Sequence, residues 1–154
     1  MTTRELIDDF LKQKRIALVG VSRKEKSYSR ELFQEFIKQG YNAVPVNPQA
    51  KELEGEKCIA RVQDIDPAAD GALILTPKRE TEQIVRDCIK AGIFRLWLPM
   101  NNGSYFKRKA NPEFTKNEQV KIITGYCPFM FLPETLFFHK FHGFILKLVG
   151  KYPK

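Results

Sequence analysis

Short apolar runs alternate with amphipathic stripes along almost the whole of this sequence. A near-continuous apolar run is typical of a strand covered on both faces, whereas apolar residues at i, i+1, i+4 and i+5 indicate one face of a helix. The expected strands are residues 16–21, 43–46, 58–60, 71–75, 94–98 and 121–124. The expected helices are residues 3–13, 32–37, 84–89, 112–118 and 134–151, with Gly40 and Gly92 closing the second and the third.

This order of elements predicts an α/β fold. Strands that alternate with helices pair in parallel, and right-handed crossovers then restrict the layout to a doubly wound, Rossmann-like sheet in a three-layer α/β/α arrangement. We expect the strand order 3-2-1-4-5, with the last short strand at one edge. The helix at residues 3–13 is an addition before the first strand. Residues 1–128 are assigned to the Rossmann-like domain and residues 129–154 to an aromatic, basic, helical extension of it.

Composition narrows the classes of protein that fit. The 154 residues include 43% hydrophobic ones, which suits a globular domain, and the N-terminus has no apolar signal segment. Three cysteines without CxxC spacing argue against a disulfide framework, so we expect a cytoplasmic protein. The formal net charge of +8 predicts an anionic partner. Because no helix-turn-helix, zinc-finger or RNP pattern is present, specific nucleic-acid binding is not expected.

A ligand of such a sheet is expected beyond the carboxyl ends of its strands, at the point where the winding direction switches. Gly20 allows a tight turn there, Ser22 adds a hydroxyl, and Arg23 and Lys26 add charge beside the free amides that begin the next helix. These features are typical of a phosphate-binding loop. The candidate binding residues at this edge are Gly20, Val21, Ser22, Arg23, Lys26, Asn47, Pro48, Thr76 and Pro77.

A nicotinamide dinucleotide fits the same edge less well. Its sites normally carry GxGxxG after the first strand, and of those glycines the sequence keeps only Gly20. They also carry Asp or Glu at the end of the second strand, where this chain has Asn47.

Cys127, His139 and His142 are the residues best suited to catalysis or to metal binding. They form no recognisable catalytic arrangement, and three ligands fall short of the four of a tetrahedral zinc site. We therefore expect neither a catalytic group nor a metal site, with Cys127 a small buried residue.

The segment 134–151 is predicted to form an amphipathic basic helix, because its phenylalanines and aliphatic residues recur at helical intervals. Helices of this composition also lie on anionic membranes. So broad an apolar stripe is more typical of packing on its own domain or of a homodimer contact, which is the interpretation adopted here.

Four segments together resemble one family. They are residues 16–22 (IALVGVS), 40–48 (GYNAVPVNP), 96–99 (LWLP) and 127–128 (CP). Over about residues 5–128 the chain resembles the stand-alone CoA-binding domain proteins, which are related to the CoA-binding domain of succinyl-CoA synthetase. Two segments depart from the family pattern: residues 102–114 are longer than expected, and residues 129–154 are unusually aromatic and basic.

The resemblance implies a role for each candidate binding residue. Gly20, Val21, Ser22, Arg23 and Lys26 would face the CoA phosphates, Asn47 and Pro48 would lie near the adenosine end, and Thr76 and Pro77 would line the opposite wall. The expected function is therefore binding of coenzyme A or an acyl-CoA without catalysis by the chain itself. The alternative is an NAD(P)-binding oxidoreductase or redox-sensing protein.

Overall fold

Five parallel strands form the central sheet of the computed structural model, which describes residues 1–99, 106 and 112–133. The strands are β1 (Arg15–Val19), β2 (Asn42–Val46), β5 (Gly71–Ile74), β6 (Arg95–Leu98) and β7 (Lys121–Thr124). They lie in the order β2-β1-β5-β6-β7, so the winding direction switches between β1 and β5. The predicted switch point is confirmed.

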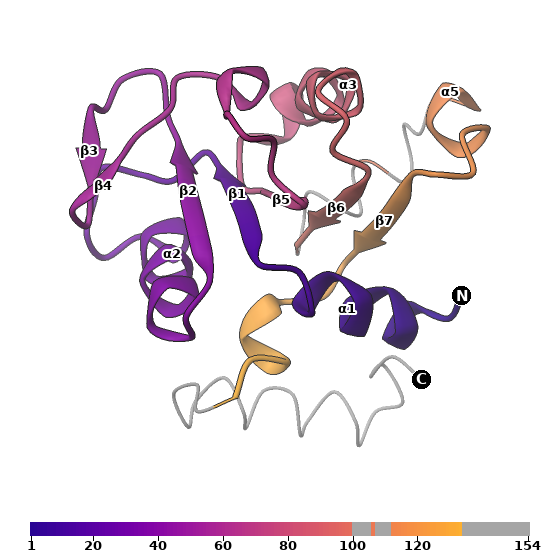
Figure 1. Ribbon diagram of the computed structural model, residues 1–154, viewed down its shortest axis with the longest axis horizontal. Helices are drawn as coiled ribbons and strands as arrows, with labels where there is room; N and C mark the ends of the chain where they lie inside the picture. Colours follow the sequence, from indigo (N-terminus) through magenta and orange to yellow (C-terminus); the bar gives the residue numbers. More distant parts are fainter. Residues whose placement is uncertain (100–105, 107–111, 134–154) are drawn as a thin grey trace.

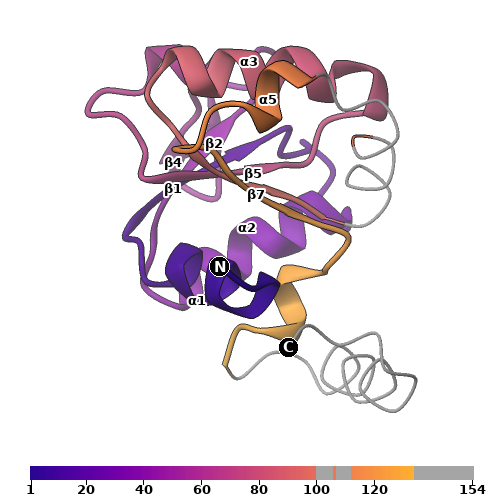
Figure 2. The same ribbon diagram turned by 90° about the vertical axis from the view of Figure 1, so that its right-hand side faces the viewer.

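Helices cover both faces of this sheet. Helices α1 (Thr3–Leu11) and α2 (Tyr28–Lys38) lie on one face, and α3 (Thr81–Lys90) and α5 (Pro112–Thr115) lie on the other (Figures 1 and 2). The chain also forms short 3-10 turns, which are η1 (Val62–Asp64), η2 (Lys78–Glu80) and η3 (Pro128–Met130). The predicted three-layer, doubly wound architecture with an added N-terminal helix is confirmed.

Alternate residues of each strand enter two separate cores. Leu18, Leu73 and Trp97 pack with the apolar stripes of α1 and α2, whereas Val19 and Ile74 pack with that of α3. Because both faces are buried, the strands read as unbroken apolar runs rather than as alternating ones.

Helix α1 is fixed to the sheet at the amino ends of β6 and β7. The rings of Phe10 and Trp97 pack edge to face, with 5.3 Å between their centroids. The carboxylate of Asp9 accepts hydrogen bonds from Arg95 Nε at 2.8 Å and from Lys121 Nζ at 3.3 Å. This ion pair lies at the end of the sheet opposite to the carboxyl ends of the strands.

The strand predicted at residues 58–60 is wrong in extent. Only Ile59 pairs with β2, in a single parallel bridge to Val46, in which its amide donates to Pro45 and its carbonyl accepts from Asn47. The residues before it form an antiparallel hairpin, β3 (Glu52–Leu53) and β4 (Glu56–Lys57). Three apolar residues flanked by charged ones provide too little buried surface for a longer pairing, although Ile59 keeps the predicted place next to β2.

One helix boundary also differs from the sequence prediction. The helix expected at residues 112–118 ends at Thr115. Phe129 and Leu132, just after residue 128, are buried in the core beside α1 and α2, and the division into residues 1–128 and an extension of the same domain at 129–154 stays a prediction. The helix predicted at residues 134–151 lies outside the described residues.

Within the described part of the chain, no helix is both long enough and apolar enough to span a bilayer.

Candidate functional site

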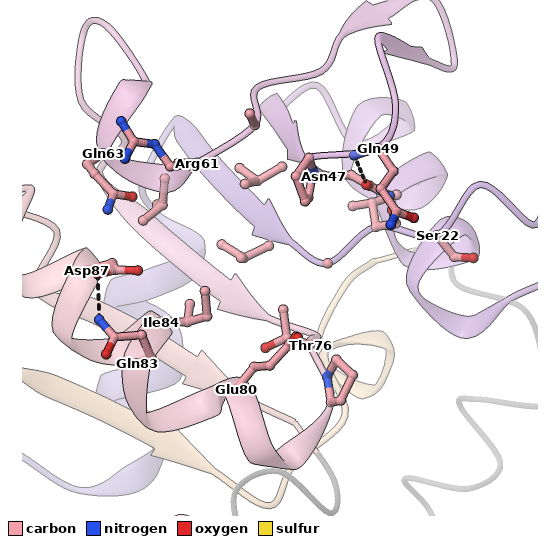
Figure 3. A pocket seen from close by; sticks show the side chains of 18 of the residues that line it. Ser22, Asn47, Gln49, Arg61, Gln63, Thr76, Glu80, Gln83, Ile84 and Asp87 are labelled. Carbon is pink, nitrogen blue, oxygen red and sulfur yellow. Dashed lines mark hydrogen bonds between the residues drawn. The ribbon is translucent and has the colours of Figure 1, made fainter.

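A cavity of about 700 Å³ opens beyond the carboxyl ends of β1, β2 and β5 (Figure 3). This is the switch point of the sheet, where loops leave neighbouring strands in opposite directions and form a crevice. Its floor includes Val19 and Val46, the last residues of β1 and β2. Its walls come from the segments after β1, β2 and β5, from the segment that includes η1 and from the first turns of α3.

Gly20 makes the turn out of β1 with a φ of +94°, in the region that side-chain-bearing residues avoid. A Cβ at this position would lie 2.9 Å from both Cγ2 and the amide nitrogen of Thr76. Glycine therefore serves twice here, because it permits the backbone conformation and lets the ends of β1 and β5 approach closely.

Asn47, at the end of β2, fixes the loops on either side of it. Its side-chain amide donates to the carbonyl of Val21 at 2.8 Å, and its side-chain oxygen accepts from the amide of Gln49 at 2.8 Å. The side chain thus holds the loop after β1 to the loop after β2. Both of these loops contribute residues to the cavity wall.

Serines order the start of α2. Ser27 caps the helix by accepting from the amide of Arg30 at 3.3 Å, and Ser29 Oγ accepts from the amide of Ser22 at 2.9 Å. Ser22 Oγ in turn accepts from the amide of Lys24 at 3.0 Å. The helix N-terminus, with its partial positive charge, therefore lies directly behind the loop that edges the cavity.

The structure brings most of the predicted binding residues together around this cavity. Those that line it are Gly20, Val21, Ser22, Asn47, Pro48, Thr76 and Pro77. Arg23 and Lys26 are not among the lining residues, and both side chains are exposed on the loop before α2. Any charge they add to a ligand would act from the rim of the cavity.

Several residues of the cavity wall escaped the sequence prediction. Arg61 and Gln63 come from the segment that includes η1, and Gln83 and Asp87 come from one face of α3. Gln83 Nε2 donates to Asp87 Oδ1 at 2.9 Å, which Figure 3 shows at the end of the cavity away from Ser22. Their i, i+4 spacing on a helix that follows a binding loop was the one sequence signal that could have found this last pair.

The charges on the wall balance. Arg61 and Arg79 line the cavity together with Glu80 and Asp87. Arg61 is also paired with Asp64, its Nε lying 3.0 Å from the carboxylate. Attraction for an anion must therefore depend on backbone amides and on the rim more than on a basic wall.

No reactive thiol faces the cavity among the described residues. Cys58, Cys88 and Cys127 are all buried free cysteines, and burial raises the pKa of each thiol, that of Cys88 to about 12. Cys127 Sγ lies 3.3 Å from the hydroxyl of Tyr28, in agreement with its expected structural place. His139 and His142 lie outside the described residues. Within those residues no group of three or more His, Cys, Asp or Glu side chains is placed to hold a metal ion.

Comparison with known proteins finds a family and relatives that resemble this chain. Residues 14–132 match the profile of the family described as "CoA binding domain". The chain is 30% identical over 89 residues to the alpha subunit of acetate–CoA ligase [ADP-forming] II of Pyrococcus furiosus, an alignment that covers 57% of this chain and 20% of that subunit. It is 31% identical over 80 residues to the uncharacterised protein YneT of Bacillus subtilis, covering 52% of this chain and 57% of that one.

A solved structure agrees with these sequence matches. The hypothetical protein from Pyrococcus horikoshii superposes with a TM-score of 0.70 at 27% identity, over 83% of this chain and 87% of the other. The matched part of this chain thus corresponds to most of a small protein, but to only a fifth of the ligase subunit.

Proposed function

Because the profile match spans residues 14–132, the chain belongs to the CoA binding domain family, and we propose that it binds coenzyme A or an acyl-CoA in the cavity at the switch point. In this proposal the chain performs no catalysis of its own. The observation that carries the proposal is the loop from Gly20 to Ser22, which edges the cavity and leads to the N-terminus of α2. That geometry suits a phosphate, since backbone amides and the helix dipole both favour an anion.

The chemistry of the cavity wall suggests where each part of CoA would lie. The phosphates of CoA would meet the loop after β1, with Arg23 and Lys26 adding charge from its exposed side. Thr76 and Pro77 would line the wall opposite Asn47 and Pro48, on either side of the ligand. A nicotinamide dinucleotide is the less favoured occupant, because the side chain of Asn47 is already engaged with the Val21 carbonyl and provides no carboxylate for ribose hydroxyls.

Thermal unfolding in the presence of ligands tests the proposal. A ligand at a hundred times its dissociation constant stabilises a fold by roughly 2.7 kcal/mol, which raises Tm by about 5 to 10 °C for a chain of this size. We expect CoA and acetyl-CoA to produce this shift and NADH to produce none. A shift with NADH and none with millimolar CoA would refute the proposal.

The double variant R23A/K26A measures what the rim contributes. Both side chains are exposed, so their removal should leave the fold intact. We expect weaker CoA binding, and a weaker dependence of the remaining affinity on salt, because exposed charges attract an anion through solvent that salt screens. Unchanged affinity at low salt would show that neither side chain contributes to the site.

A further inference from the structure

Three consecutive backbone carbonyls in the loop after β1 are bound by side chains. Asn47 donates to the carbonyl of Val21 at 2.8 Å. Arg30 Nη1 donates to the carbonyls of Ser22 and Arg23, at 3.4 and 3.2 Å. When the carbonyls of a loop are held in this way, its amides point away from the side chains that hold them.

The geometry of the peptide bond fixes where those amides point. In a planar trans peptide the carbonyl and the following N–H point in opposite directions. Arg30 therefore turns the amides of Arg23 and Lys24 away from itself. The Lys24 amide is taken up by Ser22 Oγ, while the Arg23 amide has no protein acceptor among the described residues. An outward amide beside a helix N-terminus is the unit from which anion-binding loops are built.

Arg30 itself is not placed to act as a cation toward the ligand. The residue is 8% exposed and does not line the cavity. Its Nε donates to Glu54 Oε1 at 2.7 Å, and Gln34 Nε2 donates to the same oxygen at 2.8 Å. The charge of Arg30 is therefore balanced by Glu54, and its Nη1 is directed at the loop backbone.

Glu54 links this arrangement to the cavity wall that includes Ala60 and Arg61. It lies between β3 and β4 with a φ of +53°, followed by Gly55 at +76°. The chain continues from β4 through Ile59, which pairs with β2, to Ala60 and Arg61 in the cavity wall. The hairpin thus joins the loop after β1 to the segment that forms another side of the cavity.

We propose that Arg30, held by Glu54, is a positioning residue for the anion-binding loop: it binds the carbonyls of Ser22 and Arg23 and so orients the Arg23 amide, at the rim of the cavity, toward a phosphate. This inference rests on the proposed function and adds a mechanism to it. A phosphate would be bound by the outward Arg23 amide beside the start of α2, while Arg30, the one arginine that is buried among the described residues, acts on the backbone rather than on the ligand.

The test compares R30K with wild type in three measurements. These are calorimetric titration with CoA and with inorganic pyrophosphate, the salt dependence of the affinity, and amide hydrogen exchange at Ser22 and Lys24. Lysine keeps the charge but lacks the fork of donors that reaches Glu54 and two carbonyls together. We expect affinity for both probes to fall about tenfold, which corresponds to about 1.4 kcal/mol. We also expect an unchanged salt dependence and faster exchange at both amides.

The matched control is D9N, which weakens a partly exposed ion pair with Arg95 at the other end of the sheet. It should leave CoA affinity and the exchange of both loop amides unchanged. E54Q provides a second variant if R30K does not fold, because it keeps the shape of the partner and removes its charge. It should lower the affinity for both probes and speed the exchange of both amides by smaller amounts, again with an unchanged salt dependence.

The outcomes separate the two proposals. Wild-type protein that binds neither CoA nor pyrophosphate refutes the proposed function and this inference together. Normal wild-type binding with unchanged affinity in R30K and E54Q overturns the inference alone. A fall in affinity with unaltered amide exchange and a reduced salt dependence also overturns it, because Arg30 would then contact the ligand as a cation.

Discussion

Replacement of Gly20 by alanine should destabilise the fold and damage the cavity through two separable effects. The first is conformational, since a side chain at a φ of +94° costs about 1 to 2 kcal/mol. The second is steric, because the new Cβ would lie 2.9 Å from Thr76 Cγ2 and from the Thr76 amide nitrogen, and 3.1 Å from the Leu75 carbonyl carbon. Two of these three atoms belong to the backbone and cannot rotate away. Overpacking of this kind costs about 1 to 3 kcal/mol.

G40A is the matched control for this experiment. Gly40 follows α2 with a φ of +89°, and a Cβ there would meet nothing within 4 Å. It therefore shares the conformational cost of Gly20 without the steric one. Urea unfolding should give a loss of about 2 to 5 kcal/mol in the free energy of unfolding for G20A, and about 1 to 2 kcal/mol for G40A.

The difference between the two variants is the quantity that tests the reasoning. A larger loss in G20A, together with weaker CoA binding, would show that the ends of β1 and β5 must approach closely to form the cavity. Equal losses in the two variants would refute the steric argument. CoA affinity that survives in G20A would show that the close approach to Thr76 is not needed by the ligand.

Three further measurements follow from the described contacts. The three cysteine thiols should react with a thiol-specific dye at pH 8 only after unfolding, because burial raises the pKa of each; rapid labelling of native protein would contradict this. The hydrogen bond from Arg95 lowers the pKa of Asp9 below its ordinary value of about 3.8. The ionised carboxylate therefore stabilises the fold at pH values above 3.8, and this stabilisation is lost as the pH falls through the lowered pKa. D9N should accordingly reduce the free energy of unfolding by about 0.5 to 1 kcal/mol at pH 7, and by less at pH 3; an equal loss at both values would show that the charge of Asp9 contributes nothing. W97F should lower the free energy of unfolding in urea by about 1 to 3 kcal/mol, because it removes the 3.0 Å hydrogen bond from Trp97 Nε1 to the Tyr126 carbonyl. An unchanged free energy of unfolding would show that water donates to this carbonyl in place of the indole.

Much of the site was predictable because position in a parallel sheet is encoded locally. The apolar runs locate β1, β2 and β5, and the residues after each run must then lie at the same edge. Seven of the nine candidate binding residues line the cavity for this reason, from Gly20 to Pro77. The two that do not, Arg23 and Lys26, were chosen for their charge. Charge in a sequence carries no information about the direction in which a side chain points.

The residues that the sequence did not identify are those whose place depends on packing between distant segments. Arg30 was one of many cations in the sequence, and only the fold brings Glu54 to it across 24 residues of chain. Gln83 and Asp87 enter the cavity wall because α3 packs on the face of the sheet that includes Ala72 and Ile74 of β5. The strand at residues 58–60 was overestimated because an apolar run does not reveal how many residues its neighbour can pair.

The sequence by itself determined the class of fold, the order of its strands and the edge at which a ligand would lie, since hydrophobic periodicity and right-handed crossovers leave few alternatives. The tertiary structure decided how the loop at that edge is oriented. Hydrogen bonds from Asn47 and Arg30 to loop carbonyls depend on atoms brought together from separate elements, and no local pattern in the sequence specifies them.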